Sequence, residues 1–173
     1  MRQPKKSRAK FWARFGPALA VFVLAIVLQS RGSGTIKALA PIDVLTAGVT
    51  AAFLKLTGMP VQQEAAVLSH PAGFSYEIYY KCTGLILVLF LSAALLALPG
   101  RWGSRIKNVI FGAVFVLTLN FMRLTGLFYI GVRCPRAFDL FHGILFEVAM
   151  LGFVLGFWLL SLRRAGSRPA PFY

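Results

Sequence analysis

The stretch VIFGAVFVLTLNFMRLTGLFYIG, residues 109–131, decides the fold. It is an apolar run of 23 residues. At about 1.5 Å per residue, a helix of this length crosses a hydrocarbon core of about 30 Å. Its two strongly polar members, Asn120 and Arg123, are three residues apart and therefore share one helical face. We therefore expect a membrane-spanning helix that carries a cation inside the membrane.

The whole chain has the composition of a membrane protein. Of its 173 residues 58% are hydrophobic, and its mean hydropathy is +0.72. Ordinary soluble domains contain only about 45–50% apolar residues. The 19 Lys and Arg residues against 5 Asp and Glu residues give a formal net charge of +14, but the cations fall in short clusters between apolar runs. This arrangement favours a membrane protein over a soluble one with a nucleic-acid-binding patch, so no nucleic-acid partner is expected.

Three further apolar runs accompany residues 109–131. Residues 15–28 follow a basic segment and lack a small-residue cleavage site, so we expect a retained anchor. Residues 141–162 are long enough to span, whereas residues 83–98 span only if the bilayer thins or flanking residues extend the helix. The sequence predicts an all-α polytopic membrane protein in one domain, residues 1–173, with about four spanning helices.

Positive charges orient these helices. Twelve of the 19 cations lie in segments 1–14, 100–107 and 163–173, which contain no acid. Lys and Arg in short loops mark the cytoplasmic side, so we expect both termini and the 100–107 loop inside the cytoplasmic (inner) membrane. An even number of crossings must then separate 1–14 from 100–107. The interrupted apolar stretch 38–56 is therefore expected to be an interfacial or re-entrant helix on the outer side.

Residues 59–81 mix strand formers with Pro and Gly. The tetrapeptide His70-Pro71-Ala72-Gly73 lies in the middle of this segment. Pro and Gly between two strand-forming runs are typical of a turn. We therefore expect a small extracytoplasmic hairpin in which His70 is a turn residue.

Cys82 and Arg123 are the first candidates for chemistry. Cys82 immediately precedes the 83–98 run, where the positive end of a helix dipole would lower its pKa and favour the nucleophilic thiolate. The alternative is an inert, buried cysteine. Arg123 lies about 10 Å inside its helix, where a charge is costly unless it is functional or paired. Asn120 could present donors beside it, and Glu147 is its candidate ion-pair partner at a similar depth.

His142 is the third candidate, at the start of the last apolar run. Asp139, three residues earlier, could orient the imidazole and cap the helix. Glu147 is about 140° further round a regular helix, so it is expected to serve the same cavity less readily. Cys82, Arg123 and His142 thus come from different helices but share the outer side of the predicted membrane. Thiol, guanidinium and imidazole are the parts of an acyl-transfer site.

The same three residues carry a family resemblance. YKCTGL, around Cys82, resembles the cysteine motif of the exosortase/archaeosortase family, NFMR its Asn-x-x-Arg motif and FHG its histidine motif, in the same order. Thr83 stands where Ser is frequent, and the short chain resembles the compact single-module members. The resemblance implies that Cys82 is the nucleophile, Arg123 the oxyanion partner and His142 the proton carrier.

The resemblance also implies an activity and a kind of partner. Such a protein is a cysteine transpeptidase or protease of the cytoplasmic membrane with its active site facing outward. Its partners are membrane lipid and protein substrates with a C-terminal sorting signal, made of a short motif, a transmembrane helix and a basic tail. No metal or other cofactor is implied.

Two alternatives stay open from the residues alone. The first is a thiol redox or metal protein built from residues expected on the outer side: Cys82, Cys134, Asp139 and His142. Because the chain lacks C-x-x-C spacing, we expect Cys134 to be free and dispensable. The second is a non-enzymatic membrane scaffold or transport subunit in which Arg123 and Glu147 form a structural pair.

Overall fold

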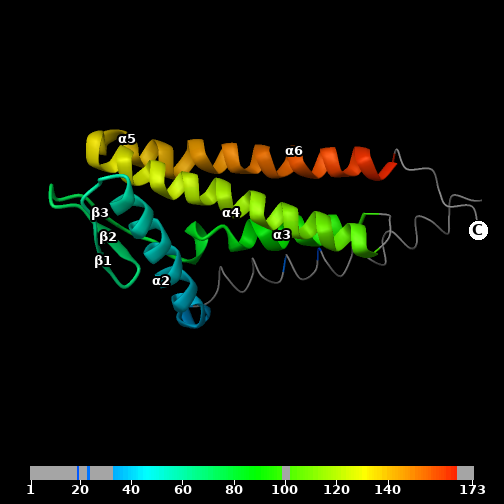
Figure 1. The fold of residues 1–173 in the computed structure, drawn as a ribbon, viewed down its shortest axis with the longest axis horizontal. Coiled ribbons are helices and arrows are strands. Elements are labelled where there is room, and N and C mark those ends of the chain that lie inside the picture. The colour runs from blue at the N-terminus through cyan, green and yellow to red at the C-terminus, as the bar shows by residue number, and fades with distance from the viewer. Residues whose placement is uncertain (1–18, 20–22, 24–32, 99–101, 167–173) are drawn as a thin grey trace, which may run out of the picture.

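The structure, a computed structural model, describes Leu19, Val23 and residues 33–98 and 102–166. Apart from Leu19 and Val23, which are helical, the anchor predicted at 15–28 lies outside the described residues. The described chain is mainly helical, with one small sheet at an end of the molecule (Figure 1).

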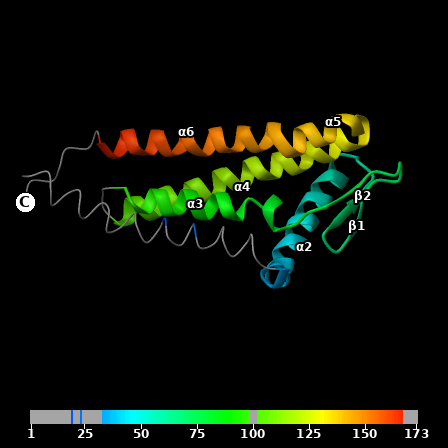
Figure 2. The same ribbon diagram turned by 180° about the vertical axis from the view of Figure 1, so that it is seen from behind.

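The long axis of the molecule is a bundle of three helical segments. Helix α4 (Trp102–Arg133) lies between α3 (Leu85–Leu96) and α6 (Phe146–Gly166) and packs against both. The short helix α5 (Pro135–Leu140) and the π-helical segment η2 (Phe141–Leu145) lead without a break into α6, as both views show (Figures 1 and 2). Chain direction reverses at Cys134, so α4 and α6 run antiparallel.

Three helices in the described part of the chain are long and apolar enough to cross a membrane: Leu39–Leu56, Trp102–Arg133 and Pro135–Arg164. The all-α polytopic fold is therefore confirmed. The helix predicted at 109–131 is longer than expected, and the last one begins at Pro135 and not at residue 141. Helix α3 has 12 residues, a rise of about 18 Å, and is shorter than the run predicted at 83–98.

Helix α2 (Ser33–Leu56) is one continuous helix of 24 residues with Pro41 inside it. It lies obliquely to the three-helix bundle (Figures 1 and 2). Because Leu39–Leu56 is long and apolar enough to cross a membrane, the interfacial or re-entrant placement of residues 38–56 stays a prediction. Thr46 and Thr50 fit this apolar helix because their hydroxyls donate to the carbonyls of Ile42 and Thr46, at 2.7 and 2.8 Å.

The predicted hairpin is present with one strand more than expected. Strands β1 (Gln62–Glu64), β2 (Val67–Ser69) and β3 (Ser75–Glu77) form an antiparallel sheet in that order. His70 begins the β2–β3 turn, where its carbonyl accepts from the Gly73 N–H at 2.9 Å and its Nδ1 from the Ala72 N–H at 3.0 Å. His70 is thus a turn residue, as predicted.

Two apolar clusters hold these elements together. One joins α2, the sheet and the later half of α4 through Leu54, Leu68, Ile78 and Phe128. The other joins α3, α4 and α6: Leu91, Leu95, Leu98, Val116, Met150 and Val154. Cys82 belongs to the first cluster and directly precedes the helix that builds the second.

Candidate active site

Cys82 is placed by a short turn between the sheet and α3. This turn, the 3₁₀ helix η1 (Tyr80–Cys82), is closed by the Cys82 N–H donating to the Tyr79 carbonyl at 2.6 Å. The Thr83 hydroxyl donates to the Tyr80 carbonyl at 2.8 Å. Gly84 then adopts φ 76°, a left-handed conformation that favours glycine, and α3 begins at Leu85. Cys82 lies just before the helix, as predicted, and is buried.

Asn120 anchors the Cys82 backbone from α4. Its Nδ2 donates to the Cys82 carbonyl at 2.7 Å. Gly84 permits this approach, because a Cβ there would lie 3.1 Å from the Asn120 Cβ and Cγ. The amide is therefore engaged with the backbone of the candidate nucleophile, and presentation of its donors beside Arg123, which the sequence suggested, is not what the structure shows.

His142 reaches Cys82 from the third segment. Its Nε2 lies 3.8 Å from the Cys82 Sγ, within hydrogen-bonding range for sulfur. The imidazole stacks on the Phe138 ring, with centroids 5.3 Å apart and an interplanar angle of 16°. Phe138 thus fixes the plane in which His142 presents Nε2 to the thiol.

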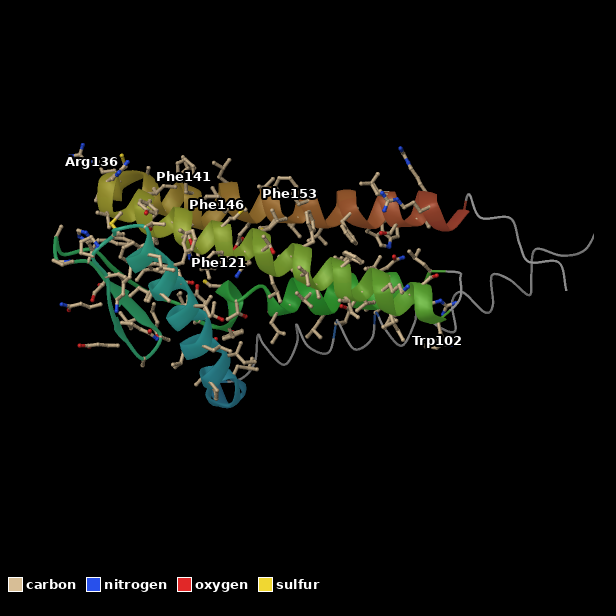
Figure 3. All side chains as sticks on the ribbon, in the orientation of Figure 1. Trp102, Phe121, Arg136, Phe141, Phe146 and Phe153 are labelled. Carbon is tan, nitrogen blue, oxygen red and sulfur yellow. The ribbon has the colours of Figure 1, made fainter. Side chains whose placement is uncertain are left out.

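The π-helical turn η2 explains how Arg123 contacts the His142 backbone. In a regular α-helix the Phe146 N–H would donate to the carbonyl of residue 142, but here it donates to the carbonyl of Phe141. The carbonyl of His142 instead accepts from Arg123 Nη2 at 3.3 Å. Figure 3 labels Phe141 and Phe146, which bracket this turn near α5.

Arg123 is the buried cation of the site. Its side chain is 6% exposed, and its Nη2 lies 4.0 Å from Glu147 Oε1, whose side chain is 62% exposed. The predicted ion pair therefore exists as a long contact to a largely exposed carboxylate. The π-helical turn between His142 and Glu147 changes their relative direction from that in a regular helix. Because the contact is long and Glu147 is largely exposed, its smaller part in the same cavity stays a prediction.

Burial raises the pKa of the Cys82 thiol above its ordinary value. The Arg123 charge and hydrogen bonds from Tyr79 lower that pKa and offset part of the effect. The sequence predicted a lowered pKa from the helix dipole, so the direction was wrong. Burial therefore disfavours the thiolate of Cys82, and the groups around it offset part of that effect.

The surroundings of Asp139 and Cys134 differ from expectation. The last helix starts at Pro135 with Cys134 as its N-cap residue, so Asp139 lies inside α5 and does not cap it. No hydrogen bond joins Asp139 to His142 among the residues the structure describes. Cys134 is a free, exposed cysteine and Cys82 a free, buried one. Within residues 33–98 and 102–166, no cluster of three or more His, Cys, Asp and Glu side chains is suited to hold a metal ion.

Two tyrosines near the site escaped the sequence analysis. The Tyr79 carbonyl accepts from the Cys82 N–H at 2.6 Å, and the ring of Tyr79 packs edge-on against that of Tyr80. Tyr76, on β3, is buried and donates to the Leu124 carbonyl at 3.1 Å, one residue after Arg123. Burial raises the pKa of Tyr76, which keeps its hydroxyl a donor. Their only sequence signal is closeness to Cys82 in SYEIYYKC, which does not reveal the contact with α4.

Fold and site together define a polytopic membrane protein in which a buried thiol, an imidazole and a guanidinium are gathered from three segments. Residues 8–161, most of the chain, match the family of transmembrane exosortases. The chain therefore belongs to the transmembrane exosortase family, which confirms the resemblance carried by the three motifs. No curated protein and no solved structure matches it. Family membership supports a membrane enzyme of the cysteine-peptidase kind with a role in protein sorting.

Proposed function

We propose that this protein is a cysteine transpeptidase or protease that cleaves C-terminal sorting signals of exported proteins at the outer face of the cytoplasmic membrane. The observation that carries the proposal is the 3.8 Å approach of His142 Nε2 to the Cys82 Sγ, with Arg123 bound to the carbonyl of the same histidine. Membership of the exosortase family supports the same chemistry.

In the first step, His142 Nε2 takes the proton of the Cys82 thiol and the thiolate attacks the scissile carbonyl carbon. This general-base step suits a thiol whose pKa is raised by burial, because the proton needs an acceptor within reach. A C–S bond forms, and the carbonyl π electrons move to oxygen. Arg123 stabilises that negative charge, since a buried guanidinium acts strongly where water is excluded.

In the second step, the tetrahedral intermediate collapses to a thioester as the C–N bond breaks. His142 returns its proton to the leaving amine, which departs with the transmembrane helix and basic tail of the sorting signal. Water or an acceptor amine then attacks the thioester and releases Cys82. Hydrolysis makes the protein a protease, and attack by an amine makes it a transpeptidase.

The proposed orientation follows from charge. The N-terminal segment, the 100–107 loop and the tail hold twelve of the 19 cations and are assigned to the cytoplasm. Cys82 and His142 lie near the other end of the α3–α4–α6 bundle, beside the sheet. The scissile bond is therefore placed at the outer border of the membrane, and the substrate's basic tail on the same side as the enzyme's own cationic segments.

The test is to co-express the full chain with a sorting-signal substrate and follow substrate cleavage by immunoblot. We expect Cys82→Ala to abolish processing at unchanged enzyme level, and Cys134→Ala to retain it because that thiol is exposed and outside the site. Undiminished processing by Cys82→Ala would exclude Cys82 as the nucleophile.

A second function is favoured by one contact. Arg123 and Glu147 lie 4.0 Å apart, as a structural pair in a non-enzymatic membrane scaffold or transport subunit requires. In that case Arg123→Gln and Glu147→Gln, which each break the pair, would disturb folding in the same way.

A further inference from the structure

A cavity of about 450 Å³ opens between α4 and α6, far along the bundle from Cys82. Helix α4 contributes Lys107, Asn108 and Phe111 to its wall. Helix α6 contributes residues spaced three or four apart, which lie on one helical face: Phe157, Leu160, Ser161 and Arg164. The cavity lies toward the Trp102 end of α4, and Figure 3 shows Trp102 at the opposite end of the bundle from Phe141.

Both helices order these side chains in the same way along the bundle. Helix α4 begins at Trp102, so Lys107 lies nearer this end of the bundle than Phe111. Helix α6 ends at Gly166, at the same end of the bundle, so Arg164 lies nearer that end than Phe157. At about 1.5 Å per residue, Phe157 and Arg164 are separated by about 10 Å along the axis. The rim of the cavity, at the Trp102 end of the bundle, is thus cationic, and its floor toward the middle of the bundle is aromatic.

The aromatic floor is fixed by packing. The Phe157 ring stacks on Phe115, with centroids 5.3 Å apart and an interplanar angle of 23°. Gly112 lies beside it, since a Cβ there would be 3.3 Å from the Phe157 ring. The Ser161 hydroxyl donates to the Phe157 carbonyl at 2.9 Å and is satisfied within its own helix. The rim carries the charged groups of the lining, Lys107 and Arg164, together with the Asn108 amide.

We propose that this cavity binds an anionic phospholipid, with its phosphate between Lys107 and Arg164 and its first acyl carbons against Phe111 and Phe157. The depth order of charge and apolar surface is that of a phospholipid in a leaflet, and basic pockets between membrane helices suit anionic headgroups. The lining contains no Asp or Glu. A soluble anion would leave the aromatic floor unused, and a cationic peptide tail would be repelled by the rim.

The test is native mass spectrometry of the full-length protein in detergent, titrated with phosphatidylglycerol or with phosphatidylcholine of the same acyl chains. We expect phosphatidylglycerol to bind at about tenfold lower concentration, as charge-assisted contacts to phosphate and removal of the quaternary ammonium predict. The double variant Lys107→Gln/Arg164→Gln should lose that preference.

Matched controls separate the cavity from general attraction between charges. Lys55→Gln/Arg163→Gln removes the same charge from exposed positions outside the cavity, one of them adjacent to Arg164, and should keep the preference. Leu160→Trp fills the cavity without changing charge and should weaken binding of phosphatidylglycerol, whereas Leu159→Trp, next to it but outside the lining, should not.

Three results would overturn the proposal. They are equal binding of the two lipids by the unmodified chain, an equal loss of preference in the Lys55/Arg163 control, and full competition by inorganic phosphate at concentrations that leave the lipid soluble. The last result would assign the cavity to a soluble anion. Because the measurement follows lipid binding and not cleavage, it stands apart from the proposed peptidase activity.

Discussion

The two halves of α4 are built by different chemistry. From Trp102 to about Val116 the helix packs against α3 and α6 through apolar contacts, with Leu91 and Leu95 close enough that a Cβ on Gly112 would lie 3.0 Å from each. From Asn120 to Gly131 it also makes directed hydrogen bonds: the Asn120 and Arg123 side chains donate to backbone carbonyls of η1 and η2, and Tyr76 of the sheet donates to the Leu124 carbonyl. The first half is held mainly by apolar burial, with one hydrogen bond from the buried Arg105 to the Leu96 carbonyl at 3.5 Å. The later half adds the polar contacts of the site to its own apolar packing.

This difference indicates what each half can tolerate. Apolar packing is non-directional, and swaps that conserve volume cost little. The polar contacts join positions far apart in the chain, such as Asn120 with Cys82 and Leu124 with Tyr76, and a buried polar group that loses its partner is costly. Substitutions at the residues that make these polar contacts should therefore affect activity most strongly.

The largest effect is expected for Arg123→Gln. Loss of the guanidinium removes charge from the position where the oxyanion forms, and removal of such a donor costs about 10²–10³ in rate. Glu147→Gln should retain most activity, because that side chain is 62% exposed and 4.0 Å from Arg123. Substrate processing measures the activity of both variants, and thermal unfolding of the two purified proteins measures their stability.

The pair of variants also tests the structural alternative. If Arg123 and Glu147 served only as a structural pair, both variants would lower the melting temperature equally, and processing would fall only as far as protein level does. An Arg123→Gln variant that is folded but inactive, beside an active Glu147→Gln variant, assigns Arg123 to the chemistry.

A smaller loss is expected for Asn120→Ala. The Cys82 carbonyl would lose its donor at 2.7 Å, and leaving a buried acceptor unpaired costs about 1–3 kcal/mol of unfolding free energy. Processing should fall by about tenfold, since Cys82 is then held less firmly opposite His142. Thr118→Ala, on the exposed side of the same helix, is the control, because Thr118 bonds only the Val114 carbonyl of its own helix. Equal losses in both variants would contradict the anchoring role of Asn120.

Much of this architecture could be predicted from sequence because it depends on local patterns. The run at 109–131 predicted α4, a charge inside a membrane helix marked Arg123, and Pro and Gly after His70 predicted the turn. The proximity of Cys82 and His142 followed from placing both near the same face of the membrane. The clusters of positive charge and the lengths of the apolar runs can both be taken from the sequence without knowing the fold.

The remaining features depend on contacts between distant segments. The additional strand β1 has three residues and no strong sequence signal, and it pairs with β2 from Gln62 opposite Ser69 to Glu64 opposite Val67. The π-helical turn at Phe141–Leu145 is defined by which carbonyl the Phe146 N–H selects, and no residue pattern reveals that choice. The raised pKa of Cys82 likewise comes from burial beneath other segments, which a local sequence pattern does not reveal.

The smallest effect concerns that pKa, and it distinguishes burial from the helix dipole. In a Cys134→Ala background, the rate of reaction with a small methanethiosulfonate should rise with pH as the thiolate forms. Because burial raises the pKa of Cys82, the midpoint should lie above the ordinary cysteine value of about 8.5. Arg123 lowers that pKa, so Arg123→Gln should move the midpoint to still higher pH, whereas the exposed Arg163→Gln should leave it in place. A midpoint below the ordinary value in the Cys134→Ala protein would show that the dipole of α3 and the Arg123 charge outweigh burial, and that Cys82 ionises without needing His142 as its base.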